Sequence, residues 1–268
     1  MLRVDDVTVR FGGISALRGV TLEAADGLVT GLIGPNGAGK TTLFNVATGL
    51  QRPRTGCVVL DGRDVTRLGP GQRSRRGLGR TFQRLEVFGS LSVRDNVLLA
   101  AEVERGWRSV SGSGRGSARQ VADTLVERTG LGHLADTAAA ELPTGSARLL
   151  ELARALATRP STLLLDEPGS GLDESETRDL GDLLLEVAAQ GTAVLLVEHD
   201  VELVMRVCTT VTVLDFGQVL AQGSPAEVQA DPRVQDAYLG AAPPAGPPAG
   251  RPAGPPVTAA PDREQVML

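Results

Sequence analysis

A glycine-rich segment at residues 31–43, GLIGPNGAGKTTL, carries residue types that can bind a polyphosphate. It fits the spacing G-x-x-x-x-G-K-[S/T], with Gly34, Gly39, Lys40 and Thr41 at the specified positions. Glycines let the backbone approach an anion closely, and a helix that follows adds its positive N-terminal end. The loop that we expect to hold the phosphates consists of Gly34, Pro35, Asn36, Gly37, Ala38, Gly39, Lys40, Thr41 and Thr42.

Lys40 is the only lysine in the chain, so arginine supplies every other permanently charged cationic side chain. A compact ammonium can touch the β- and γ-oxygens of a triphosphate, whereas the planar guanidinium is wider and favours bidentate contacts. We infer that phosphate binding requires a lysine at this position. The neighbouring hydroxyl of Thr41 suits Mg²⁺, and Thr42 can reach a further phosphate.

Two acidic residues and a histidine follow apolar runs later in the chain. Asp166 and Glu167 lie at the end of STLLLDEP, and His199 lies at the end of TAVLLVEHD. Ligands of parallel sheets bind at the carboxyl ends of the strands, so these side chains can meet at one edge. Asp166 would hold Mg²⁺ through water, Glu167 would act as general base, and His199 could donate to the γ-phosphate. The alternatives are a surface acidic turn and a structural histidine.

The surrounding sequence predicts the elements that position these groups. Apolar runs at 161–168 and 192–200 are typical of buried parallel strands, and the segment between them predicts a helix closed by Gly191. Together they form a strand–helix–strand crossover, which indicates an α/β fold. Further strands are expected at 2–11, 20–24, 27–34 and 57–65, a hairpin at 211–223, and helices at 40–50, 91–105, 121–136 and 146–160.

Composition narrows the classes of function. The net charge of −5 argues against a nucleic-acid-binding protein that relies on overall positive charge. No apolar run reaches the ~18 residues needed to span a bilayer, and the N-terminus lacks the apolar core of a signal peptide. Cys57 and Cys208 form no CxxC pair, so we expect reduced thiols in the cytoplasm.

Two segments have the composition of irregular structure. Residues 105–120, RGWRSVSGSGRGSARQ, are expected to form a flexible surface loop. Residues 241–268 are rich in proline, alanine and glycine, which predicts a disordered tail, with a docking segment as the alternative.

The order of the motifs resembles that of the nucleotide-binding subunits of ABC transporters. The similarity extends over about residues 1–240 and includes GPNGAGKTT, RTFQ, LPTGSARLLELARAL, LLLDEPGSGLD and EHD. The segments RFGGISAL, FNVATGL, RTFQRLEVF, EHDVELVM and DPRVQDAYLG make the chain most similar to the branched-chain amino acid and urea uptake branch. The resemblance implies a P-loop NTPase core with an N-terminal antiparallel β subdomain and a helical subdomain inserted at about residues 84–160.

The same resemblance implies roles for three further residues. Phe11 would stack on the adenine, and Gln83 would contact Mg²⁺ or the attacking water and report the nucleotide state to the transmembrane partner. Asp173 would lie at the interface between two ATPase subunits.

The segment RLEVFGSLSVRDNV at 84–97 would line a groove that receives a coupling helix of the permease. Its apolar residues Leu85, Val87 and Phe88 suit a core equally well. Four arginines precede the segment and are expected to form a solvated face: Arg73, Arg75, Arg76 and Arg80.

One motif departs from the family pattern. The family signature LSGGQ falls on Leu142, Pro143, Thr144, Gly145 and Ser146, a segment that caps the γ-phosphate bound to the opposite subunit. Pro143 replaces the serine and has neither a hydroxyl nor an N–H. Loss of one charge-assisted hydrogen bond would cost roughly 1.5–3 kcal/mol. Slow catalysis, or a heteromeric partner with a standard signature, is therefore expected.

The resemblance implies an ATPase that uses ATP and Mg²⁺ to energise uptake of a small polar solute, such as a branched-chain amino acid. It would lie peripherally at the cytoplasmic face of the cell membrane and bind no nucleic acid. Its implied partners are transmembrane permease subunits, a second ABC ATPase subunit and an extracytoplasmic solute-binding protein. The alternatives are a non-transport ABC ATPase that acts as an ATP-gated interaction module, and a regulatory half-site with impaired hydrolysis.

Overall fold

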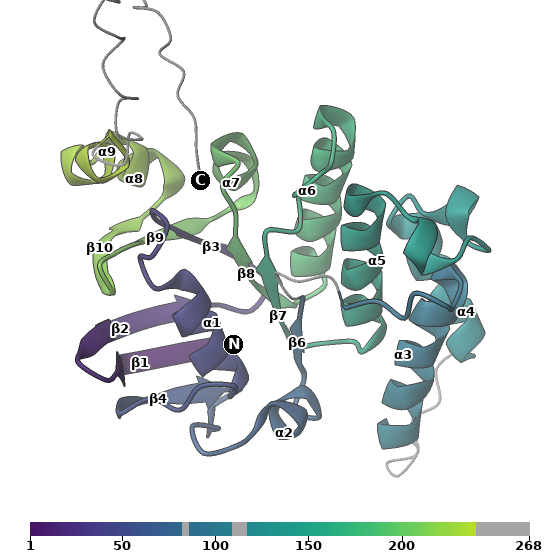
Figure 1. Cartoon of the computed structure of the whole chain (residues 1–268), viewed down its shortest axis with the longest axis horizontal. Coiled ribbons are helices and arrows are strands. Elements are labelled where there is room, and N and C mark those ends of the chain that lie inside the picture. Colours follow the sequence, from purple (N-terminus) through teal and green to yellow (C-terminus); the bar gives the residue numbers. More distant parts are fainter. Residues whose placement is uncertain (82–85, 109–116, 240–268) are drawn as a thin grey trace, which may run out of the picture.

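The computed structural model describes residues 1–81, 86–108 and 117–239. Within this part of the chain, Figure 1 shows two β-sheets with helices beside and between them. The smaller sheet is antiparallel, in the order β2-β1-β4-β5, as expected for the N-terminal strands. Its strands are β1 (Leu2–Phe11), β2 (Ile14–Ala24), β4 (Thr55–Leu60) and β5 (Arg63–Asp64).

The larger sheet has the order β10-β9-β3-β8-β7-β6, and its strands are parallel except for β10 at one edge. β7 and β8 are neighbours connected through α6 (Glu174–Ala189), which confirms the predicted crossover. β9 and β10 form the hairpin predicted at 211–223. The strands are β3 (Val29–Ile33), β6 (Leu78–Arg80), β7 (Thr162–Asp166), β8 (Ala193–Val197), β9 (Thr210–Asp215) and β10 (Gln218–Gly223).

Alternate side chains of the larger sheet enter two separate cores. Leu164 and Leu195 belong to a cluster with α1 (Lys40–Thr48) and the antiparallel sheet. Leu163 and Leu196 belong to the cluster formed with the helices on the opposite face. Because both faces are covered, β7 and β8 are continuously apolar, as buried parallel strands are expected to be. The carboxyl end of β7 lies next to the start of α1.

Three helices between β6 and β7 in the sequence lie together on one side of the molecule (Figure 1). They are α3 (Val93–Arg108), α4 (Ala118–Arg128) and α5 (Thr144–Ala157), with 3₁₀ turns at Gly132–Leu134 and Ala139–Glu141.

Both ends of the loop expected at 105–120 are helical, so that prediction was too wide. α4 begins inside it because Ser117 forms a capping box with Gln120, which stabilises the first turn despite the nearby glycines. Residues 109–116 lie outside the described residues, as does the tail expected at 241–268.

The remaining helices are short. They are α2 (Pro70–Ser74), α7 (Val201–Val207), α8 (Pro225–Ala230) and α9 (Pro232–Leu239). None of the helices in the described ranges is long and apolar enough to cross a membrane.

The expectation that four arginines form one solvated face was wrong for two of them. Arg73 is 0% exposed and donates to the carbonyl oxygens of Val46 and Ala47, each at 2.6 Å, at the C-terminal end of α1. It also donates to the carbonyls of Thr66 and Leu68, each at 3.0 Å. Carbonyls at a helix end lack partners within the helix, so a buried guanidinium with several donors can satisfy them.

Arg80 is the second exception, because its side chain is 8% exposed and points toward Asp166. Its Nη1 donates to Asn45 Oδ1 at 2.9 Å and to Thr48 Oγ1 at 3.2 Å. Only Arg75 and Arg76 are exposed, as expected.

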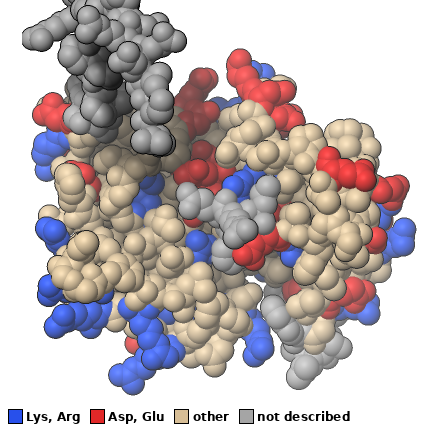
Figure 2. Space-filling view, viewed as in Figure 1, with Lys and Arg blue, Asp and Glu red and all other residues tan. Residues whose placement is uncertain are grey.

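Charged side chains are distributed unevenly over the surface. In the view of Figure 2, basic side chains gather over the antiparallel sheet, and acidic ones gather toward the helices on the other side. The first 80 residues contain 12 Lys and Arg against 6 Asp and Glu. The overall negative charge therefore does not describe each face of the molecule.

Candidate nucleotide-binding site

The glycine-rich loop connects β3 to α1 and packs against neighbouring strands. Gly34 has φ +150° and Gly39 has φ +108°. A Cβ atom on Gly34 would lie 2.1 Å from the carbonyl oxygen of Leu214, and one on Gly39 would lie 2.9 Å from that of Ala16. Two of the glycines are thus required by contacts within the protein as well as by the approach of an anion.

Gly37 differs from these two glycines because it faces open space. Its φ is +81°, and a Cβ atom placed there would meet no atom of residues 1–81, 86–108 or 117–239 within 4 Å. This side of the loop is accessible to a ligand. The helix that starts at Lys40 directs its N-terminal amides to the same place.

Lys40 is buried within the loop. Its Nζ donates to the carbonyl oxygens of Gly34 at 2.6 Å and Pro35 at 3.1 Å. Burial lowers the pKa of Lys40, while the carboxylates of Glu167 and Asp166 act to raise it. An ammonium has three donors, so one remains to contact a phosphate oxygen without disturbing either carbonyl.

Asp166 ends β7 and is 3% exposed. Its Oδ2 accepts no hydrogen bond from the residues that the structure describes and lies 3.7 Å from Arg80 Nη2. Burial raises the pKa of Asp166, although Arg80 opposes the shift. A buried carboxylate oxygen without a donor fits the water shell of a bound Mg²⁺, because buried acceptors are normally satisfied.

Glu167 and His199 lie at the ends of adjacent strands and are in direct contact. Glu167 Oε1 is 2.7 Å from His199 Nε2. The Glu167 amide donates to the carbonyl of Val197 at 2.9 Å, and its φ of +52° is unusual for a residue other than glycine. Strained backbone of this kind is concentrated at functional sites, where surrounding contacts hold it in place.

Most of the phosphate loop and both carboxylates line one cavity of about 280 Å³, whereas His199 contacts Glu167 from outside its lining. Its lining is made by the loop, the start of α1 and the acidic pair: Ala16, Asn36, Gly37, Ala38, Gly39, Lys40, Thr41, Thr42, Asp166 and Glu167. The structure therefore brings together a cationic cradle, two hydroxyls and two carboxylates, the groups needed to bind a metal-complexed polyphosphate and to activate a water.

Phe11 and Asp173 were also predicted for the site, and neither is among the residues that line this cavity. Phe11, at the end of β1, is 51% exposed, so its ring is open to a stacking partner. Asp173 is the N-cap of α6 and accepts from the amide of Glu176 at 2.8 Å. Gln83 lies outside the described residues.

The signature segment forms the start of α5. Pro143 is the N-cap and supplies no side-chain hydrogen bond, whereas Thr144 is exposed and Ser146 is half-buried. Gly145 is buried, and a Cβ atom on it would lie 2.5 Å from the carbonyl oxygen of Gly171. Leu142 packs against the helical core. Within the described residues, no side chain caps the first-turn amides of α5.

Sequence reasoning missed two charged residues beside the site. Arg80 lies next to Asp166, as described above, and Glu198 is 7% exposed directly before His199. Glu198 accepts from the amide of Gly169 at 2.6 Å and from that of His199 at 3.1 Å, so it connects two strand ends. An acidic residue at the end of an apolar run was a signal that could have identified Glu198.

Residues 17–170 match the model of the family described as ABC transporter. Residues 218–243 match a second model, described as branched-chain amino acid ATP-binding cassette transporter.

Individual relatives extend the similarity over most of the chain. The high-affinity branched-chain amino acid transport ATP-binding protein LivG of Salmonella typhimurium is 39% identical over 252 residues, covering 90% of this chain and 98% of the relative. The lipopolysaccharide export system ATP-binding protein LptB of Acidithiobacillus ferridurans is 39% identical over 230 residues, covering 84% and 90%. A crystal structure of a nucleotide-free ATP-binding cassette from an ABC transporter is similar with a TM-score of 0.78 at 31% identity, covering 89% of this chain and 98% of that one.

Proposed function

Because this chain belongs to the ABC transporter family, we propose that it is the ATP-binding and ATP-hydrolysing subunit of a transporter that takes up branched-chain amino acids or related solutes. The observation that carries the proposal is the single cavity lined by Lys40, Thr41, Asp166 and Glu167. The cassette alone does not decide the cargo, since its relatives include both an amino acid transport protein and a lipopolysaccharide export protein. The match of residues 218–243 to the branched-chain amino acid model favours uptake.

The residues of the cavity would divide the work of binding ATP. Loop amides and Lys40 would hold the β- and γ-phosphates, and the exposed ring of Phe11 would stack on the adenine. Mg²⁺, when bound, would neutralise charge on the same phosphates. Thr41 would hold it directly and Asp166 through water, and we assign Gln83 to the same ion or to the attacking water.

Hydrolysis requires a base next to the γ-phosphate. We assign this role to Glu167, whose carboxylate lies in the cavity and contacts His199 at 2.7 Å. The base would take a proton from the attacking water, and His199 would orient Glu167 or donate to the γ-phosphate. Glu198 would keep His199 in place through its backbone contact at 3.1 Å.

A single subunit offers only part of this site. The uncapped start of α5, with Leu142, Thr144, Gly145 and Ser146, would face the γ-phosphate held by a second ATPase subunit, and Asp173 would lie at that interface. Pro143 leaves this end of α5 without a hydroxyl at the capping position. We therefore propose a heterodimer in which a partner with a standard signature completes the more active site.

We place the ATP-binding domain at residues 1–240 and assign residues 84–160 to a helical subdomain within it. Membership of this family implies that the subunit acts with transmembrane permease subunits. We propose that it lies at the cytoplasmic face of the membrane and that an extracytoplasmic solute-binding protein delivers the cargo.

The Glu167→Gln variant tests the catalytic assignment. We expect it to bind ATP as tightly as the wild type and to hydrolyse it at least about 100-fold more slowly, as general-base catalysis contributes roughly 10²–10⁴-fold. Calorimetry with ATP and phosphate release by the purified complex are the measurements. Hydrolysis at the wild-type rate would remove Glu167 from the mechanism.

The cargo is tested separately in cells. Deleting the gene should abolish high-affinity uptake of radiolabelled leucine, isoleucine or valine, and the wild-type gene should restore it whereas the Glu167→Gln gene should not. Affinity isolation from native membranes should recover a permease and a second ATPase subunit. Unchanged uptake of all three amino acids in the deletion strain would contradict the assigned cargo.

A further inference from the structure

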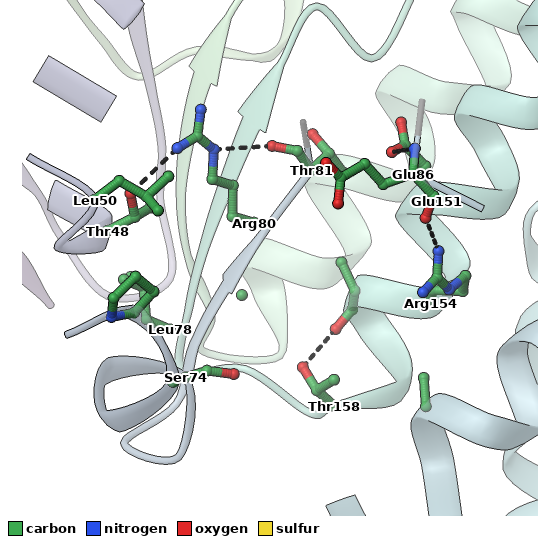
Figure 3. A pocket seen from close by; sticks show the side chains of 15 residues that line it. Thr48, Leu50, Ser74, Leu78, Arg80, Thr81, Glu86, Glu151, Arg154 and Thr158 are labelled. Carbon is green, nitrogen blue, oxygen red and sulfur yellow. Dashed lines mark hydrogen bonds between the residues drawn. The ribbon is translucent and has the colours of Figure 1, made fainter. Parts of the chain in front are cut away.

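A second cavity, of about 360 Å³, lies between α1 and α2 on one side and α5 on the other. Figure 3 shows Thr48, Leu50 and Arg80 on one side of it, and Glu86, Glu151 and Arg154 together on the opposite side. The side formed by α5 is connected to the site described above, because the same helix begins at the signature residues Thr144–Ser146.

Side chains of α5 hold both backbone polar groups of Glu86. Its amide donates to Glu151 Oε1 at 2.8 Å, and its carbonyl oxygen accepts from Arg154 Nη1. Both contacts involve the backbone of Glu86 rather than its exposed side chain. Residues 151 and 154 are about one helical turn apart, which places them on the same face of α5.

The chain stays attached to helices after Glu86. The guanidinium of Arg154 lies 4.8 Å from the centre of the Phe88 ring. Asn96, in α3 and fully buried, accepts from the Phe88 amide at 2.9 Å and donates to the Phe88 carbonyl at 3.0 Å. Residues 86–88 are therefore fixed to the helical side of the molecule.

The chain before this segment is attached to the sheet instead. The Thr81 amide donates to the carbonyl of Leu164 at 3.0 Å, and Thr81 Oγ1 accepts from the Asp166 amide at 3.1 Å. Thr81 is thus attached to the sheet that holds the acidic pair, whereas Glu86 is attached to α5, which carries the signature. If the helices moved relative to the sheet, Glu86 would move with α5.

The carboxylate of Glu151 that accepts from the Glu86 amide is buried, so this hydrogen bond is not a surface contact. Glu151 is 5% exposed, and burial raises its pKa, although the Glu86 amide and Arg148 act in the opposite direction. Its other oxygen, Oε2, contacts Arg148 Nη1 at 3.0 Å. Burying a carboxylate is costly unless its oxygens are paired, and the two pairs here anchor one wall of the cavity to the interior of α5.

We propose that Glu151 and Arg154 are positioning residues that fasten the chain at Glu86 to α5, so that a displacement of this cavity wall is passed to the signature residues at the start of the helix. The proposal rests on the proposed function, because it assumes that the start of α5 meets ATP in a second subunit. It concerns how the signature is positioned and not how ATP is held.

The first test measures the attachment in the purified full chain by amide hydrogen exchange. In the Glu151→Ala variant, the amide of Glu86 should exchange about 10-fold faster or more, as expected when a hydrogen bond to a charged group is lost. Glu151→Gln retains an acceptor, so in this variant the Glu86 amide should exchange nearly as slowly as in the wild type. Glu86→Ala is the matched control, because the backbone contact survives removal of that side chain.

The second test measures ATP hydrolysis by the complex isolated from native membranes. Glu151→Ala should lower kcat for ATP about 10-fold and change KM by less than about twofold, since it leaves the cradle intact. Glu151→Gln should restore most of kcat. Arg154→Ala removes the carbonyl half of the attachment and should have the same effect, which keeps the test possible if Glu151→Ala fails to fold.

Two outcomes would overturn the proposal: unchanged exchange at Glu86 in both alanine variants, or faster exchange with wild-type kcat. A failure of the proposed function is distinguishable from these, because the wild-type complex itself would then not hydrolyse ATP.

Discussion

Replacement of Asp166 by asparagine is expected to stabilise the ligand-free protein while impairing the site. Asp166 is 3% exposed, and within the described part of the chain its Oδ2 accepts no hydrogen bond. Leaving such an acceptor unsatisfied costs about 1–3 kcal/mol, and more when it is charged. Part of this cost is offset by the attraction of Arg80 at 3.7 Å. We therefore expect a net gain of about 1 kcal/mol, or about 2–4 °C in Tm for a chain of this size.

The pH dependence of this gain follows from the direction of the pKa shift. Burial raises the pKa of Asp166 above its ordinary value of 3.8, so the folded state holds its proton to a higher pH than the unfolded state. At pH below 3.8 both states are protonated and the group contributes no penalty. As pH rises through 3.8 and then through the folded-state pKa, the native state loses stability relative to the unfolded state. The advantage of Asp166→Asn should therefore be larger at pH 7.5 than at or below pH 3.8, and it should stop growing above the folded-state pKa.

Thermal unfolding with and without ligand is the assay. At 100 times its dissociation constant, a ligand stabilises the native state by about 2.7 kcal/mol. For the wild type, the rise in Tm caused by Mg²⁺ and ATP together should exceed the rise caused by ATP alone. In Asp166→Asn the Mg²⁺-dependent part should be small or lost. A ligand-free Tm below that of the wild type would refute the reasoning, because the carboxylate would then stabilise the fold.

Three other substitutions test separate parts of the structure. Lys40→Ala should weaken ATP binding by at least about 10-fold, since it removes a charged donor to the phosphates; an unchanged dissociation constant by calorimetry would contradict the cradle. Arg73→Ala should lower the free energy of unfolding by about 3 kcal/mol, because it leaves buried carbonyls at the end of α1 without donors; denaturant titration checks this, and a change below about 1 kcal/mol would count against it. Pro143→Ser adds a capping hydroxyl to α5 and should raise kcat about 10-fold in dimers of the purified subunit, where a second copy of this chain supplies the signature; a kcat equal to that of the wild type would show that the signature does not limit turnover.

Most of the larger sheet and the phosphate loop could be predicted from the sequence. β7 and β8 are short, continuous apolar runs with polar residues at their ends, which is typical of buried parallel strands. The spacing G-x-x-x-x-G-K-[S/T] before a predicted helix indicates a phosphate-binding loop. The contact between Glu167 and His199 was within reach for the same reason, since parallel neighbours bring their carboxyl ends to one edge.

The contacts that fix the buried arginines could not be predicted in this way. Arg73 lies in a run of charged residues that is typical of a solvated face, and its carbonyl partners Val46 and Ala47 are more than 20 positions away in the sequence. Periodicity describes which face of an element is apolar, but it does not reveal which helix end needs a donor. The attachment of Glu86 to Glu151 is equally invisible, because it uses a backbone amide that any residue would supply.

The solitary lysine makes the chain unusually suited to spectroscopy. In a protein labelled with ¹³C and ¹⁵N only at lysine, a single side chain carries the isotopes, and that side chain sits in the phosphate loop. Its one set of resonances would follow nucleotide arrival, exchange and release directly in the assembled complex, without assignment of the rest of the spectrum.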